Sequence, residues 1–167
     1  MDEIVAGRER PATFNGPLEA GLRAVAILGA AHPRTLDLQR LVAFDYLLVH
    51  TGDIGGPASL HPASPLHSAE LLVRRELVQR GLLLMMTREL VNREFEPTGI
   101  RYHAGENAAP FLSALESDYL AALRDRAAWL VGALADRTEQ EFRAVMRRFF
   151  DNWVEEFQAV ERSLGAE

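Results

Sequence analysis

The chain has 167 residues, of which 48% are hydrophobic, and it carries a formal net charge of −6 without a single cysteine. This composition excludes disulfides, thiolate metal sites and cysteine nucleophiles, and it argues against binding nucleic acid through bulk charge attraction. All eighteen basic residues are arginine, so a P-loop lysine, and with it the Walker mechanism of NTPases, is excluded, as is a Schiff-base lysine.

Length and hydropathy indicate one domain. A chain of this size can bury one core, with or without an appended helical arm. The first residues lack the apolar run of a signal peptide, and no stretch reaches the roughly eighteen apolar residues of a membrane span. We therefore expect a cytoplasmic protein without a membrane segment.

Two helices are predicted after a flexible N-terminal lead over residues 1–14. Asn15 can cap the first helix, Pro17 suits its first turn, and Pro33 ends it. Thr35 can cap the second helix, which Gly52 stops. The residues with helical spacing that we expect on the buried sides are Leu18, Leu22, Val25 and Leu28, followed by Leu38, Leu41, Phe44 and Leu48.

A loop of roughly fifteen residues rich in Gly, Pro, Ser and His separates the second helix from the third. Such a length without periodicity is uncommon in a compact domain and favours a binding or packing element. Ser68 can cap the third helix, which runs toward Arg88, and Gly81 is a point at which it could divide. Its expected inward side chains are Leu71, Leu72, Leu77 and Val78.

The period then changes to that of strands. Apolar and polar residues alternate over 90–95 and again over 100–104, and the intervening Glu96-Pro97-Thr98-Gly99 has turn chemistry. Three helices followed by a hairpin is the order of a winged helix, in which the third helix reads DNA in DNA-binding members. The predicted fold is therefore mainly α, with a winged-helix-like core over residues 15–105.

The remaining residues, 106–167, are predicted as a helical segment that packs on the core and on a partner. It comprises a short helix over 110–115, a helix over 119–135, and a last helix that starts at a Thr138/Glu141 capping box and carries one apolar stripe to Leu164. The stripe is wider than one neighbouring helix covers. We expect part of it to bind another subunit through Phe150, Trp153, Val154 and Phe157.

The loop concentrates the candidate chemistry. His50, His61 and His67, with Asp45 and Asp53 nearby, have the residue types of a zinc or iron site, but their spacing matches no ligand signature. We favour a structural role for His50, Asp53, His61 and His67, in which these side chains satisfy the backbone of an irregular loop. The glycines near Asp53 are interpreted as turn formers, and no Gly-x-Ser-x-Gly elbow accompanies the loop serines.

Arginines in and after the third helix have two interpretations. In a winged helix they could face phosphates, but an equal number of glutamates shares the stretch, so a solvated face with ion pairs is favoured. Arg74 and Arg75 are nevertheless candidates for partner binding. The residues concerned are Arg74, Arg75, Arg80, Arg88 and Arg93, with Glu70, Glu76, Glu89, Glu94 and Glu96.

The stretch from Pro17 through Arg93 resembles a known family. Its motifs PLEAGLRAVAIL, LDLQRLVAFDYLLVHTGDIGGPASLHP and ELLVRRELVQRGLLLMMTRELV are similar to the second type of middle component of bacterial ABC three-component systems. The resemblance implies a small protein encoded between an ABC ATPase of SMC or RecN type and an effector, in antiviral systems allied to Lamassu, that links the two. It implies no catalytic residues.

The favoured hypothesis is a non-enzymatic adaptor subunit without cofactor or metal, whose partners are the ATPase and the effector. A second copy of the chain is a further possible partner, and direct contact with nucleic acid is expected to be weak at most. The alternative is a winged-helix transcription regulator that binds duplex DNA as a dimer. A metal-dependent enzyme that uses the histidine loop is a third hypothesis. The face of the third helix discriminates the first two, because a regulator needs uncompensated arginines there and an adaptor does not.

Overall fold

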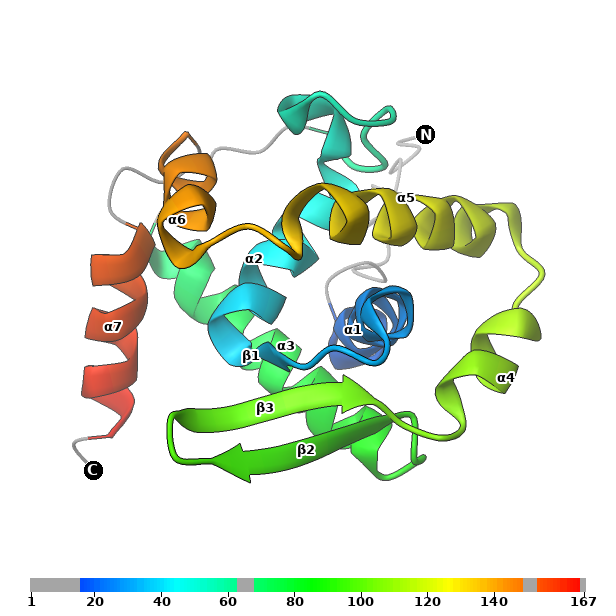
Figure 1. Cartoon of the computed structure of the whole chain (residues 1–167), viewed down its shortest axis with the longest axis horizontal. Helices are drawn as coiled ribbons and strands as arrows, with labels where there is room; N and C mark the ends of the chain where they lie inside the picture. Colours follow the sequence, from blue (N-terminus) through cyan, green and yellow to red (C-terminus); the bar gives the residue numbers. More distant parts are fainter. Residues whose placement is uncertain (1–15, 63–67, 149–152, 166–167) are drawn as a thin grey trace, which may run out of the picture.

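The structure is a computed structural model that describes residues 16–62, 68–148 and 153–165. The predicted N-terminal lead, residues 1–14, lies outside the described residues. The elements follow in the order α1 (Pro17–Ala31), β1 (Leu36–Asp37), α2 (Leu38–Val49), the 3₁₀ helix η1 (Thr51–Ile54), α3 (Ser68–Met86), β2 (Val91–Glu96), β3 (Gly99–Ala104), α4 (Ala108–Ser113), α5 (Asp118–Leu134), α6 (Glu139–Arg147) and α7 (Trp153–Leu164) (Figure 1).

Helices α1, α2 and α3 form the centre of the molecule. Val25, Leu28, Phe44 and Leu48 are fully buried there, as their spacing predicts. Helix α3 continues through Gly81 and is not divided. The glycine instead has a packing role, since it lets α3 and α1 approach each other closely. A Cβ atom at Gly81 would lie 2.5 Å from the backbone nitrogen of Gly21 in α1.

Some local predictions for these helices are wrong. Helix α1 is capped at Gly16 and not at Asn15, and Leu18 in its first turn is 53% exposed. Helix α2 is capped by Asp37 and not by Thr35, because the Asp37 carboxylate accepts a hydrogen bond from the Arg40 amide at 2.7 Å. It ends at Val49, before Gly52.

A small antiparallel sheet completes the core. The predicted hairpin is confirmed: β2 and β3 pair from Val91 opposite Ala104 to Glu96 opposite Gly99, around the turn Pro97-Thr98. The short strand β1, which periodicity did not predict, adds to the other side of β3, so the strand order is β1-β3-β2. These features confirm a mainly helical protein with a winged-helix-like core and additional helices.

Helices α4 and α5 pack on this core. Figure 1 shows α5 running across α2 and α1, with α4 at the opposite end of the molecule from α7. Helix α5 is capped by Ser117, whose hydroxyl accepts from the Leu120 amide. It buries Leu123, Ala127 and Leu130, so this segment shares the core of the winged helix.

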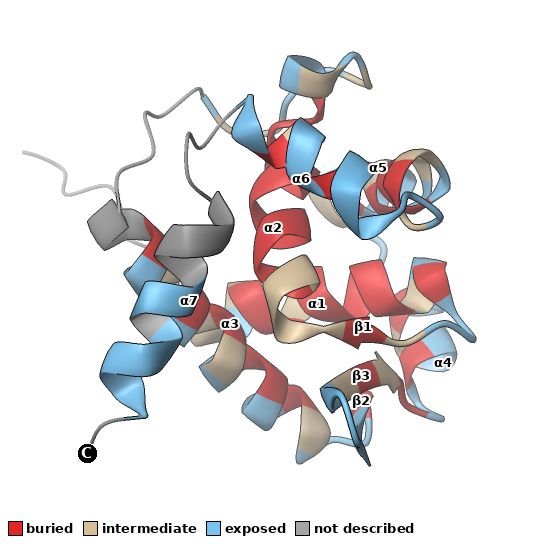
Figure 2. Cartoon of the chain, turned by 60° about the vertical axis from the view of Figure 1, so that its left-hand side comes forward, coloured by how far each residue is buried: buried red, intermediate tan, exposed pale blue. Residues whose placement is uncertain are grey.

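The prediction of one continuous last helix is wrong. Helix α6 begins at the predicted capping box, in which Thr138 and Glu141 bond each other's backbone amides, but it ends at Arg147. Helix α7 begins at Trp153 and lies along α3, away from the α2 surface on which α6 packs (Figure 2). Arg148 is the C-cap of α6, and residues 149–152 lie outside the described residues.

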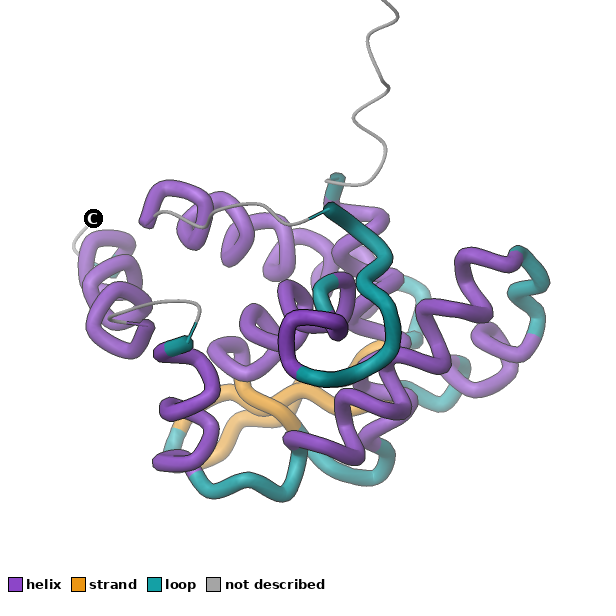
Figure 3. The backbone as a smooth tube through the Cα atoms, turned by 90° about the horizontal axis from the view of Figure 1, so that it is seen from above, coloured by secondary structure: helices purple, strands orange, loops and turns teal. Residues whose placement is uncertain are grey.

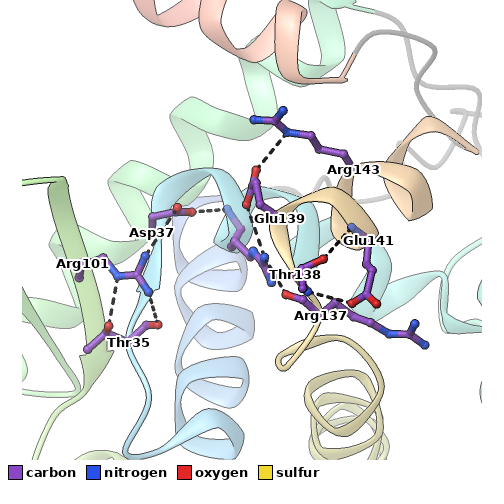
Figure 4. A network of polar contacts seen from close by, with 9 residues as sticks. Thr35, Asp37, Arg101, Arg137, Thr138, Glu139, Glu141 and Arg143 are labelled. Carbon is purple, nitrogen blue, oxygen red and sulfur yellow. Dashed lines mark hydrogen bonds and ion pairs between the residues drawn. The ribbon is translucent and has the colours of Figure 1, made fainter.

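Polar contacts join the sheet, α2 and α6 on one side (Figure 4). Arg101 of β3 donates to the Thr35 hydroxyl and carbonyl oxygens and lies 3.8 Å from Asp37. Arg40 of α2 donates to the Arg137 carbonyl oxygen and contacts Glu139 at 3.5 Å. Beneath this network, the rings of Phe142 in α6 and Phe44 in α2 meet edge to face at 6.1 Å.

Candidate functional site

A buried ionic cluster lies where α1, α2 and α3 meet. The Arg23 guanidinium donates to the Asp45 carboxylate at 2.6 Å, and Arg74 donates to its second oxygen. The Asp45 side chain is 3% exposed and that of Arg23 6%. Burial by itself would raise the pKa of Asp45, but the two guanidinium groups outweigh it and hold that pKa below the ordinary value. The cluster thus carries one negative and two positive charges.

Aromatic and imidazole rings extend the cluster toward the loop. The Tyr46 ring lies between the Arg74 guanidinium, 5.3 Å from its centroid, and the His50 ring at 4.4 Å. His61 Nε2 hydrogen-bonds the Tyr119 hydroxyl of α5 at 3.1 Å. Burial, followed by the positive charge of the arginines, lowers the pKa of both His50 and His61. Both imidazoles are therefore neutral at pH 7.

The loop after α2 projects from one side of the helical layer (Figures 1 and 3). Thr51, which the sequence analysis did not single out, and Ser59, one of the loop serines, shape it. The Thr51 hydroxyl donates to the Pro57 carbonyl oxygen at 2.7 Å, and the Ser59 hydroxyl accepts from the Gly52 amide at 3.1 Å. The Leu60 and His61 amides both bond the Val49 carbonyl oxygen.

The predicted loop residues have different positions in the structure. His50 is buried and its Nδ1 has no hydrogen-bond partner, while His61 joins the loop to α5. Asp53 is exposed in η1. His67 lies outside the described residues. The structural role of these four residues stays a prediction.

The structure of this region gives little support to a metal site or to a serine nucleophile. In residues 16–62, 68–148 and 153–165, no three His, Asp or Glu side chains converge. Asp45, one of the two carboxylates in the sequence hypothesis, is already paired with two arginines. The Ser59 hydroxyl is engaged with the loop backbone and not with a histidine.

Two of the arginines of α3, Arg74 and Arg75, are engaged within the chain. Arg75 is 8% exposed, donates to Gln79 at 2.9 Å and lies 3.5 Å from Glu161 of α7. Arg74 is paired with Asp45. The opposite side, which we call the outward face of α3, carries exposed residues at helical spacing: Leu72, Val73, Glu76, Arg80, Leu83 and Leu84. The leucines and valine there are 37–56% exposed.

Comparison with known families extends the resemblance beyond Arg93. The sequence model of the ABC-three component (ABC-3C) system Middle Component 2 family matches residues 13–156. The chain belongs to this family. No curated protein and no solved structure matches it.

The family match includes the hairpin and the helices up to the first part of α7. Of the residues predicted to bind a partner in this middle component, Phe150 lies outside the described residues. Trp153, Val154 and Phe157 belong to α7, but their side chains are also outside the description. Their role in partner binding, like that of Arg74 and Arg75, stays a prediction.

A shallow groove runs between α1, α4 and α5. Its volume is about 500 Å³, and most of its lining residues are alanine or glycine. Arg124 at its border donates to the Leu112 carbonyl oxygen at 3.1 Å. The lining of the groove does not bring together a set of reactive groups. Among the described helices, none has the length and apolarity needed to cross a bilayer.

Proposed function

We propose that this chain is a non-enzymatic adaptor subunit that links an ABC ATPase to an effector in a bacterial antiviral defence complex. Membership in the middle-component family supports a role beside the other components of such a system. The proposal assigns ATP turnover to the ATPase and gives this chain the task of positioning the effector.

The outward face of α3 is the observation that carries the proposal. In a DNA-binding winged helix this helix needs arginines that reach phosphates. Here Arg74 and Arg75 are paired within the chain, and Val73, Leu83 and Leu84 are turned outward. Exposed aliphatic side chains in a row are typical of a protein contact surface, because water is displaced from them on binding.

A winged-helix DNA-binding regulator is the alternative function. Three arginines of this part of the chain are exposed: Arg80 on the outward face of α3, Arg88 in the turn after α3 and Arg93 in β2. Three side chains supply much less counterion release than the six to ten phosphate contacts of a strong binder. The same face therefore distinguishes the two functions.

The test uses two matched double variants in α3 and in the turn that follows it. Val73→Asp with Leu84→Asp puts charge on the apolar row, and Arg80→Ala with Arg88→Ala removes two of the exposed arginines. All four residues are exposed, so both variants should keep the wild-type melting temperature. Co-purification with the ABC ATPase encoded beside the gene is then compared.

We expect the aspartate variant to bind the ATPase at least tenfold more weakly than wild type does. The alanine variant should bind it with unchanged affinity. An aspartate variant that assembles like wild type would contradict the adaptor proposal for this face. Tight, salt-sensitive DNA binding by the wild-type chain that the alanine variant loses would favour the regulator.

A further inference from the structure

The outer edge of β2 is an unused strand edge. In the order β1-β3-β2, strand β3 is paired on both sides and β2 on one. Among residues 16–62, 68–148 and 153–165, no strand lies beyond β2. An edge strand offers a row of backbone N–H and C=O groups to any extended chain that reaches it.

The register shows which backbone groups point outward. In antiparallel pairs, residues that exchange hydrogen bonds alternate with residues that do not. The Gly105 amide donates to the Leu90 carbonyl oxygen at 2.9 Å, and the same phase continues to the turn at Glu96 and Gly99. Arg93 and Phe95 are therefore in the other phase, and their backbone groups face away from β3.

The side chains beside this edge form two distinct faces. On the core-facing side, Phe95 is 75% exposed and its cross-strand neighbour Ile100 is 40% exposed. Arg93 stands 5.2 Å from the Phe95 ring centroid. Tyr102 on the same face is buried. The side chains of this face therefore start in the core at Tyr102 and extend beyond it at Ile100 and Phe95. An exposed phenylalanine is a typical anchor of a protein contact.

The other face of β2 is acidic. Glu94 and Glu96 both point there and are exposed. His103 Nε2 lies 3.1 Å from Glu94, whereas the neighbouring Arg101 is engaged with Thr35 and Asp37. A strand added to β2 would place its side chains alternately on the apolar and on the acidic face.

We propose that the β2 edge receives an extended segment of a partner subunit whose apolar residues alternate with basic residues. The backbone of that segment bonds the outward groups of Arg93 and Phe95. Its apolar side chains lie beside Phe95, and its basic side chains lie beside Glu94 and Glu96. The inference rests on the adaptor function, because it assigns the segment to a component of the same complex.

Charge disfavours a second copy of this chain as the occupant. In a two-fold antiparallel pairing centred on Arg93, this arginine lies opposite Arg93 of the second copy. In a pairing centred on Glu94, the two Glu94 carboxylates lie opposite each other. A pairing centred on Phe95 opposes Glu94 to Glu96 of the second copy. Like charges directly opposite each other destabilise a strand pair. The same charges thus select a basic partner strand and prevent self-association.

The first test uses peptides of about eight residues that alternate valine with arginine, and matched peptides with glutamate in place of arginine. Amide protection is measured by NMR on the full chain. We expect the valine–arginine peptide to protect the amides of Arg93 and Phe95, and Phe95→Ala to weaken it at least tenfold. The double variant Glu94→Arg with Glu96→Arg should reverse the preference toward the glutamate peptide.

A proline variant isolates the backbone contribution. Because the Arg93 amide faces away from β3, Arg93→Pro removes an edge donor without removing a ladder bond. It should abolish binding, while Arg93→Ala, the matched control, binds within about threefold of wild type. If the proline variant fails to fold, the effect of Phe95→Ala on peptide binding decides whether the peptide binds at the β2 edge.

Three results would overturn the inference: unchanged amides at the solubility limit of the peptide, equal binding of both peptides, or protection that depends on protein concentration alone, which would identify a second copy. In the assembled complex, failure of the two proposals is distinguishable. If the α3 variants lose the ATPase and Arg93→Pro retains every component, the edge proposal is wrong and the adaptor function stands. If wild type never binds the ATPase, the adaptor function is wrong and the peptide result still decides the edge.

Discussion

Replacing Asp45 by alanine should destabilise the chain by about 3–5 kcal/mol, the usual cost of removing one partner from a buried ion pair. The structure supports the full range, because the carboxylate is 3% exposed and serves two guanidinium groups. Arg23, 6% exposed, would stay buried after losing the carboxylate that accepts from its Nε, while Arg74, 22% exposed, can turn to water. A domain with about 5–15 kcal/mol of stability would survive with a much lower melting temperature.

Urea denaturation at pH 7, followed by circular dichroism, measures this free energy. Asp53→Ala is the control, because that carboxylate is exposed and its loss should change stability by no more than about 0.5 kcal/mol. The triple variant Asp45→Leu, Arg23→Met and Arg74→Met should recover most of the loss, since an apolar replacement needs no counter-charge. A cost below about 1 kcal/mol for Asp45→Ala, or a triple variant as unstable as the single one, would refute the buried cluster.

The sign of the acid dependence follows from the same cluster. The pKa of Asp45 is lower in the folded chain than in the unfolded chain, where it is about 3.9. Its stabilisation is therefore complete above about pH 4 and is lost as the pH falls through the folded value. The wild-type free energy of unfolding should thus decrease more steeply below pH 4 than that of Asp45→Asn.

Three further predictions concern DNA, the histidines and helix packing. The purified chain should bind duplex DNA no more tightly than the 10⁻⁴–10⁻⁶ M typical of non-specific binding at physiological salt, as fluorescence anisotropy can measure. Because the pKa of both His50 and His61 is lowered on folding, stability should fall as the pH drops below about 6.5, and His50→Phe with His61→Gln should remove that slope in urea titrations. Gly81→Ala should cost about 1–3 kcal/mol, since its Cβ would meet Gly21 at 2.5 Å, whereas Gly132→Ala, with nothing within 4 Å, should stabilise α5 slightly in thermal melts.

Features that depend on neighbouring residues were predictable from the sequence. The hairpin and the Thr138/Glu141 capping box are local, and both were predicted where the structure has them. Strand β1 was not, because two residues show no period and its partner Tyr102 is far along the chain. The break between α6 and α7 was missed because the apolar spacing continues through Asp151-Asn152, and only helix propensity marks the change.

The ionic cluster shows why the candidate site was harder to predict than the fold. Asp45 is 22 residues from Arg23 and 29 from Arg74, so no spacing rule connects them. From the sequence, Asp45 was grouped with the histidines of the next loop, and Arg74 was placed on a solvated face with ion pairs. The available signal was Asp45 itself, a charged residue in the middle of the apolar run that forms α2. A charge in such a position is buried only together with a partner, so it indicated an ion pair.

Under the proposed function, the same pairing suits a winged-helix-like core to contacts with protein. Each arginine of α3 that turns inward removes a phosphate contact from the face a regulator would use. Asp45 draws Arg74 inward, and Glu161 of α7 holds Arg75 beside the core. The exposed aliphatic residues of α3 and Phe95 on the hairpin then dominate the surfaces that would otherwise meet DNA. The whole chain carries a net charge of −6, which disfavours a polyanion and, under the proposed function, favours apolar or basic segments of a partner protein.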